Sequence, residues 1–158
     1  MSSDDNIFLA TGKPLREVAG WLAEALSLEP VENPDLKDDA FLFRGRARSV
    51  SGDLFVVLEP NVYGEADPEP EDVSAIDRSD AVVGIRCVGT KDEELQAHEA
   101  RALYEELVGA RPDVAMILSH NMAFAVAAYL PAVGTQVFPP GTSLDVEDID
   151  TWCRWVVT

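Results

Sequence analysis

The side-chain pattern of residues 41–49, FLFRGRARS, constrains the fold of this chain more than any other feature. Phe41, Phe43 and Ala47 occupy odd-numbered positions, whereas three bases, Arg44, Arg46 and Arg48, occupy even-numbered ones. Successive side chains of a strand point to opposite faces, so this segment belongs in a sheet with one apolar and one polar face. Antiparallel sheets allow that division, whereas strands of a parallel sheet are apolar on both faces.

The remaining patterns predict a layered arrangement of strands and helices. Strands are expected at 7–10, 41–49, 53–63, 81–89 and 114–120. Helical spacing of apolar residues predicts helices over 14–28, from a capping box at Thr90–Glu93 to Gly109, and within the C-terminal segment 144–157. Residues 1–158 are therefore expected to form a single α+β domain, mainly an antiparallel sheet with helices packed on one face, plus a C-terminal helix.

Residues 121–130, NMAFAVAAYL, leave two interpretations open. Alternation favours a strand, whereas the alanines and the stop at Pro131 suit a short helix beginning at Asn121. With a strand here, residues 7–63 and 81–130 repeat one order of strand, helix, strand and strand. That duplicated β-α-β-β unit resembles the arrangement of the GyrI-like small-molecule-binding folds, although no motif is shared.

Charge narrows the range of partners. The chain of 158 residues has 29 acids and 12 bases, a net charge of -17 and a pI of about 4.2. Nucleic acids and anionic membranes repel such a protein, so a basic protein partner is the easier expectation. The acids at the start of the chain do not resemble a secretory signal, and no apolar run has membrane-spanning length, so a cytoplasmic protein is expected.

Two acidic segments concentrate the negative charge. Residues 64–80, GEADPEPEDVSAIDRSD, hold seven acids and one base, and LDVEDID follows near the C-terminus. Clustered carboxylates can steer and hold a cationic partner, and an aromatic side chain beside them can add contact area. The expected partner-binding residues are Glu65, Asp67, Glu69, Glu71, Asp72, Asp145, Glu147, Asp148 and Trp155. The competing interpretation is that 64–80 is only a solvated loop.

These two segments resemble, in overall character, the immunity proteins that bacteria keep against their own basic nuclease or peptide toxins. The resemblance implies a non-enzymatic inhibitor whose carboxylates occlude the substrate-binding bases of a toxin. It also implies that no cofactor and no metal is needed. No phosphate-binding glycine loop, calcium loop or catalytic triad signature occurs in the sequence.

Two alternatives use the sheet instead of the acids. In the first, the open sheet face binds a small anionic ligand through Arg44, Arg46, Arg86 and His120. Against it stands the expectation that surplus acids of the protein pair with these arginines. In the second, Cys87 and His120 form a catalytic dyad, although no orienting acid or oxyanion loop is recognisable in the sequence.

Overall fold

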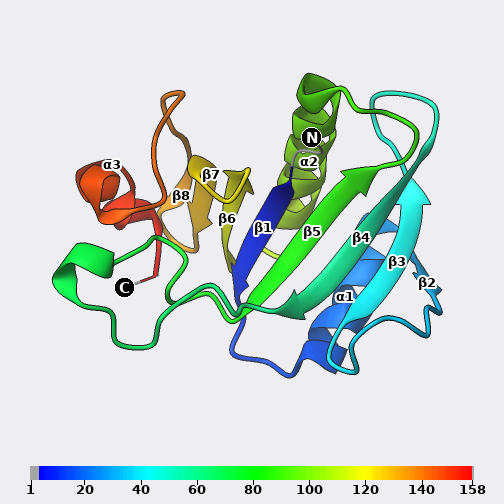
Figure 1. Cartoon of the computed structure of the whole chain (residues 1–158), viewed down its shortest axis with the longest axis horizontal. Helices are drawn as coiled ribbons and strands as arrows, with labels where there is room; N and C mark the ends of the chain where they lie inside the picture. The colour runs from blue at the N-terminus through cyan, green and yellow to red at the C-terminus, as the bar shows by residue number, and fades with distance from the viewer. Residues whose placement is uncertain (1–3, 158) are drawn as a thin grey trace.

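Residues 4–157, the part of the chain that the computed structural model describes, build one antiparallel sheet of eight strands in the order β2-β3-β4-β5-β1-β6-β7-β8 (Figure 1). The strands are β1 Asp5–Ala10, β2 Glu29–Val31, β3 Phe41–Arg46, β4 Asp53–Pro60, β5 Ala81–Cys87, β6 Ala115–His120, β7 Phe124–Leu130 and β8 Gly134–Val137. The helices are α1 Leu15–Leu26, α2 Glu93–Ala110 and α3 Ile149–Trp152. Short 3-10 turns lie at η1 Pro70–Asp72, η2 Val146–Asp148 and η3 Cys153–Trp155. The α+β class with an antiparallel sheet is confirmed.

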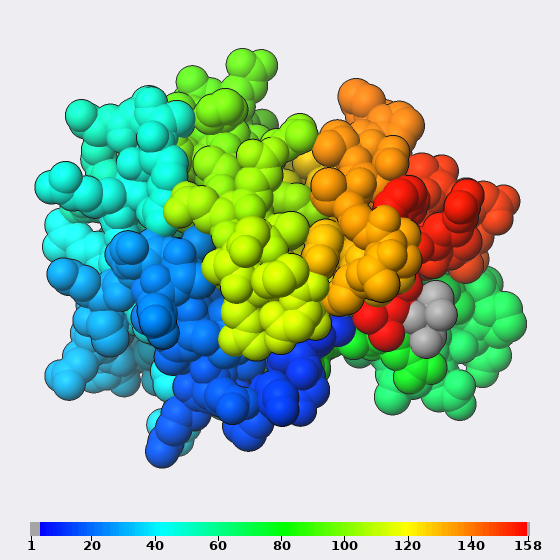
Figure 2. Space-filling view, turned by 180° about the vertical axis from the view of Figure 1, so that it is seen from behind, coloured from blue at the N-terminus to red at the C-terminus, as the bar shows by residue number. Residues whose placement is uncertain are grey.

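Helices α1 and α2 cover one face of the sheet, as Figure 2 shows from behind. The apolar positions of α1 are buried there: Val18, Ala19, Leu22 and Leu26. They meet the inward residues of the central strands, among them Ile7, Val56 and Val83, in one hydrophobic cluster. This packing confirms the expectation of helices on one face. The 3.6-residue period gathers the apolar residues of α1 on one side, and alternation does the same in the strands.

The opposite face of the sheet is only half covered. Segments 64–80 and 138–157 pack over β1, β6 and β7 in a second cluster that includes Phe8, Ile117 and Trp152. The part of the sheet formed by β3, β4 and the end of β5 has no element above it in Figure 1. The expected C-terminal helix is shorter than the pattern indicated, because only Ile149–Trp152 is α-helical and 3-10 turns flank it.

The two halves of the chain share an order but not equivalent places in the sheet. Each half runs strand, helix and three strands, and residues 124–130 form a strand as alternation favoured. After α1 the chain goes to the edge strand β2 and returns inward to β4, whereas after α2 it enters β6 beside β1 and continues outward. The related order therefore does not produce a two-fold symmetric sheet.

Two local expectations were wrong. No strand was expected between the helix at 14–28 and the strand at 41–49, but Glu29–Val31 is a short edge strand paired with β3, a position that tolerates Pro30. The side chain that caps α2 is Asp92 and not Thr90, because Asp92 accepts hydrogen bonds from the backbone of Glu94 and Leu95. Thr90 instead accepts a bond from the Asp92 backbone at 3.0 Å.

Glu99 of α2 is a fully buried carboxylate that holds the loop after β3. It accepts hydrogen bonds from the backbone nitrogens of Arg48 and Ser49, each at 2.7 Å, and from the Ser49 hydroxyl. Burial opposes ionisation, but the hydrogen bonds from Ser49 and Arg48 outweigh it and lower the pKa of Glu99. The ionised side chain thus ties α2 to the β3–β4 loop.

Replacing this carboxylate should cost stability in a pH-dependent way. A lowered folded-state pKa means that the stabilisation is complete above the ordinary value of 4.5 and is lost as pH falls through the folded-state pKa. We expect Glu99→Gln to reduce the free energy of unfolding by about 1–3 kcal/mol at neutral pH, and by less near pH 3.5. Urea unfolding at both pH values measures this, with the exposed Glu105→Gln of the same helix as control. Equal stability of Glu99→Gln and the native protein at neutral pH would contradict the assignment.

Candidate functional site

The two acidic segments meet on one side of the molecule. Ser74 and Asp145 form an isolated antiparallel bridge, and the Ala75 backbone nitrogen donates to the Leu144 carbonyl at 2.8 Å. The Ser74 hydroxyl donates to the same carbonyl at 3.2 Å. Figures 1 and 2 show the two segments side by side from both directions. We call residues 64–80 and 141–157 together the acidic lobe.

Most carboxylates expected to bind a partner point to solvent in this lobe. The exposed ones are Glu65, Asp67, Glu69, Glu71, Asp72, Asp145 and Glu147. Among residues 4–157 no ion pair joins any of them to a base. Asp148 differs, because it is half-buried and accepts a hydrogen bond from the Ser143 backbone nitrogen at 2.6 Å. Asp148 therefore shapes the lobe more than it presents charge.

Two further acids of the lobe hold the chain in place. Asp77 accepts hydrogen bonds from the backbone nitrogens of Ser74 at 2.8 Å and Glu65 at 3.2 Å. Asp80 accepts from the Thr11 backbone and hydroxyl at 2.7 and 3.0 Å, and from the Gly12 backbone at 3.0 Å. Segment 64–80 is thus tied to β1, to the C-terminal segment and to itself, which presents its remaining acids on a defined backbone.

Trp155 is less available than the sequence suggested. It is half-buried and packs against the second hydrophobic cluster beside Val156. Trp152 is 2% exposed in the same cluster, and its indole nitrogen donates to the Asp145 carbonyl at 3.2 Å. The two tryptophans therefore mainly hold the lobe together in the second cluster, and Trp155 offers a partner only part of its surface.

The arginines of the alternative site are largely engaged by acids of the protein. Arg44 and Arg86 both lie on the open sheet face, with Phe55 between them. Arg44 donates from Nε to Asp53 at 3.0 Å, and this hydrogen bond raises the pKa of Arg44. Arg86 donates to Asp4 at 3.2 Å. Arg46 is exposed and has no ion pair among residues 4–157. Of the three arginines, it alone remains as available to an anion as the hypothesis requires.

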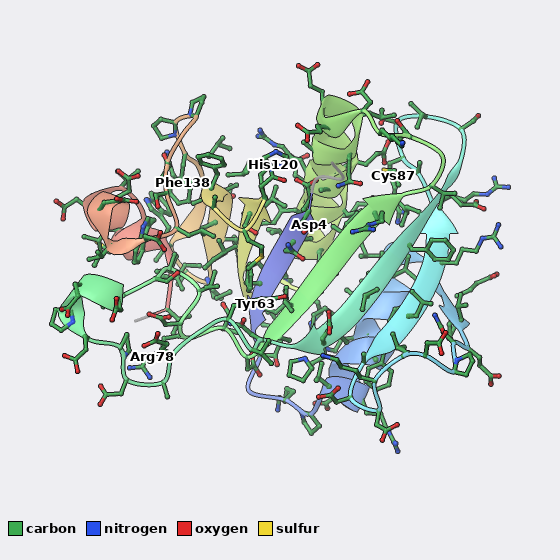
Figure 3. The ribbon with its side chains drawn as sticks, in the orientation of Figure 1. Asp4, Tyr63, Arg78, Cys87, His120 and Phe138 are labelled. Atoms are coloured by element: carbon green, nitrogen blue, oxygen red, sulfur yellow. The ribbon has the colours of Figure 1, made fainter. Side chains whose placement is uncertain are left out.

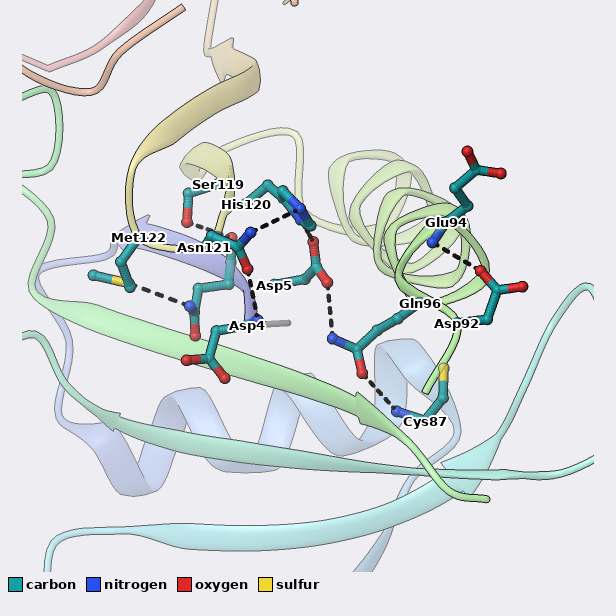
Figure 4. Close-up of polar contacts among 11 residues, drawn as sticks. Asp4, Asp5, Cys87, Asp92, Glu94, Gln96, Ser119, His120, Asn121 and Met122 are labelled. Atoms are coloured by element: carbon teal, nitrogen blue, oxygen red, sulfur yellow. Dashed lines mark hydrogen bonds and ion pairs between the residues drawn. The ribbon is translucent and has the colours of Figure 1, made fainter. Parts of the chain in front are cut away.

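His120 does not join these arginines, because it lies on the helix-covered face. Its Nδ1 is 2.7 Å from Asp5 Oδ1, and Gln96 Nε2 of α2 donates to Asp5 Oδ2 at 2.9 Å (Figure 4). Asp5 is 2% exposed, so a buried carboxylate orients the imidazole. The expectation that His120 completes an anion site on the open face is wrong. Asp5 of β1 and His120 of β6 are directly paired, so their side chains share the helix-covered face.

Sequence reasoning missed Asp5 as the partner of His120, and Gln96 as a donor to Asp5. Strand alternation could have revealed Asp5, because Asp5, Ile7 and Leu9 are every second residue of β1 and so share one buried face. His120 Nε2 lies 3.1 Å from the Asn121 side-chain nitrogen.

The Cys87 backbone nitrogen donates to Gln96 Oε1 at 3.4 Å, and burial of Cys87, with Glu99 and Asp5 nearby, raises the pKa of its thiol. A raised thiol pKa disfavours the thiolate that a Cys87–His120 dyad requires.

The described residues give no metal centre to combine with this network. Within residues 4–157 no group of three or more histidine, cysteine, aspartate or glutamate side chains could hold a metal ion. Cys87 is buried and Cys153 half-buried, both as free thiols. None of the described helices combines the length and the apolar character needed to cross a membrane.

Comparisons with known proteins add no relative to these observations. No family model matches the chain, no curated protein matches it, and no solved structure matches it. The function has to be inferred from the lobe, the sheet and their contacts. Of the residues expected from the sequence, the structure brings the acids of 64–80 together with those of 145–150, and separates His120 from Arg44, Arg46 and Arg86.

Proposed function

We propose that this protein is a non-enzymatic protein-binding domain that occludes a basic partner with its acidic lobe. The observation that carries the proposal is the joining of two acidic segments whose contact residues, Ser74 and Leu144, lie 70 positions apart. Their exposed carboxylates have no bases paired with them among residues 4–157. The lobe is thus an extended anionic surface on a fixed backbone.

Electrostatics explain why a binding role fits this surface better than a solubility role. Like charges gathered on one lobe repel each other and raise the free energy of the folded state, whereas scattered charges would give the same solubility. A cationic protein removes that repulsion on binding and is attracted from a distance. Carboxylates also pair with arginine and lysine through charge-assisted hydrogen bonds, which favours a partner rich in these residues.

Occlusion follows from the chemistry of such a partner. A nuclease or similar toxin uses basic side chains to hold the phosphates of its substrate. The carboxylates of the lobe, with Glu69, Glu71 and Asp72 at η1, would occupy those side chains and exclude the substrate without any turnover. An immunity-type inhibitor of a basic toxin in the bacterial cytoplasm acts in this way and requires no cofactor.

The anionic-ligand alternative has less support. Its arginines, Arg44 and Arg86, already bind Asp53 and Asp4. An anion would have to displace these carboxylates and would meet the surplus negative charge of the whole chain. His120 contacts Asp5 on the helix-covered face, which leaves Arg46 as the one residue of that hypothesis that is exposed on the open face without an ion pair among residues 4–157.

The test begins with basic proteins encoded next to this gene, each purified and titrated with the native chain by calorimetry. We expect one of them to bind, and its dissociation constant to rise about 10- to 100-fold between roughly 50 mM and 300 mM salt, because salt screens exposed charges. We also expect a one-to-one complex to abolish the catalytic activity of that partner. A partner that binds with no salt dependence, or that stays active when saturated, would contradict the proposal.

A further inference from the structure

A hollow of about 530 Å³ lies on the uncovered half of the sheet, next to the acidic lobe. Among the residues that line it are Asn6, Phe55, Val57, Glu59, Tyr63 and Gly84. Tyr63 immediately precedes the first residue of the lobe, and Figure 3 shows it between the lobe and the lower ends of β1 and β5. We call this feature the sheet hollow. A partner that covers the lobe from the front would also reach it.

The floor of the sheet hollow is low because of one glycine. Strand pairing places Leu42, Val57, Gly84 and Asn6 in one row across β3, β4, β5 and β1. Gly84 is the member of that row without a side chain, and a Cβ there would lie 3.3 Å from Asn6 Oδ1. A glycine inside a strand lowers stability because it has no side chain to pack, but a larger residue here would crowd Asn6 and reduce the hollow.

The walls of the sheet hollow are aromatic and apolar. Phe55 is half-buried and Tyr63 is 57% exposed, and Leu42 and Val57 add aliphatic surface between them. Aromatic faces attract a cation placed over them, and a planar guanidinium can also stack on them. The volume lies in the range of small-ligand sites, which is enough for one long side chain.

Charge decides which kind of side chain fits. Arg86 lines one end of the hollow but is engaged by Asp4 at 3.2 Å. Glu59 lines the hollow, and no ion pair joins it to a base within residues 4–157. The free charge of the hollow is therefore negative. An apolar floor, aromatic walls and one free carboxylate match a cation that carries a long apolar stem.

We propose that the sheet hollow is an anchor site for an arginine side chain of the basic partner. The stem of the arginine lies over Val57 and Gly84, its guanidinium stacks on Tyr63, and Glu59 accepts its hydrogen bonds. Arginine fits better than lysine because its planar, weakly hydrated head both stacks and pairs. This inference rests on the proposed function. It assigns a cationic group to the open sheet face, where the alternative hypothesis places an anionic ligand.

The free amino acid derivative tests the site without the partner. N-acetyl-arginine methylamide is titrated into the labelled protein and followed by amide chemical shifts, with the uncharged citrulline derivative as matched probe. We expect saturable shifts at Phe55, Val57 and Gly84, and binding about tenfold weaker for citrulline, which lacks the charge. Equal shifts with citrulline, or arginine shifts confined to residues 64–72, would overturn the inference.

Two variants separate this inference from the role of the lobe. Gly84→Val fills the hollow, and Glu59→Gln removes its free carboxylate, with the exposed Glu24→Gln on α1 as control. We expect each of the first two to abolish or weaken arginine binding about tenfold, and to weaken partner binding by a similar factor. Partner affinity that falls with lobe variants but stays at the native value in folded Gly84→Val and Glu59→Gln would leave the lobe mechanism standing and refute the anchor site.

Discussion

Reversing three charges at η1, in the variant Glu69→Lys, Glu71→Lys and Asp72→Lys, should weaken binding to the basic partner about 100- to 1,000-fold. Each reversal removes an attraction and adds a repulsion on the acidic lobe, where these side chains are exposed. None of these three side chains forms an ion pair within residues 4–157, so stability should be nearly unchanged. Calorimetric titration at low salt measures the loss.

A matched control separates local contacts from total charge. Glu32→Lys, Asp38→Lys and Asp39→Lys change the net charge by the same amount, and these exposed acids lie in the connector between β2 and β3, near the opposite edge of the sheet. We expect the control to weaken binding only a few-fold, since screening limits long-range effects to about 10 Å. Equal losses in both variants would show that overall charge, and not the lobe, controls affinity.

Trp152→Ala should destabilise the protein by about 3–5 kcal/mol, because it leaves a large cavity in the second cluster. Trp152 is 2% exposed and packs with Phe8, Ile117 and Leu144 beneath the lobe. The substitution also removes the indole hydrogen bond to the Asp145 carbonyl. We therefore expect the C-terminal segment to lose its fixed place against segment 64–80, and partner affinity to fall with stability.

Trp152→Phe is the informative comparison for this prediction. It keeps most of the buried ring but loses the indole donor, so about 1–2 kcal/mol of destabilisation is expected. Urea unfolding gives the stabilities, and amide exchange of residues 73–76 reports whether the lobe opens. A Trp152→Ala protein with native stability and native exchange in this segment would refute the supporting role assigned to Trp152.

The strands and their faces could be predicted because alternation is a local property of the chain. Arg44 and Arg46 do lie on the face opposite Phe43, and α1 buries the residues that its period indicates. Strand β2 escaped prediction because a three-residue edge strand with Pro30 has no periodicity to detect. Gln96 and Glu99 are polar yet buried on α2, because groups from β1, β5 and the loop after β3 form hydrogen bonds with them.

The assembly of the acidic lobe was beyond what sequence patterns can show. The bridge between Ser74 and Asp145 joins two irregular segments, and no period of 2 or 3.6 marks their contact. Sequence patterns also do not show which acids are structural and which remain free on the surface. Asp77 and Asp80 look like Glu69 or Glu71 in the sequence, yet hydrogen bonds to nearby backbone atoms make the former structural. The pairing of Arg44 and Arg86 with acids was foreseeable as a general tendency, but not their partners.

The hydrogen-exchange footprint of the bound partner tests the central claim most directly. Amide exchange is compared for the free chain and the saturated complex over residues 4–157. The account predicts protection of both parts of the lobe, within 64–76 and 143–150, with little change at α1 and α2. Protection confined to the helices or to the connector 32–40, with the lobe exchanging as in the free protein, would contradict it.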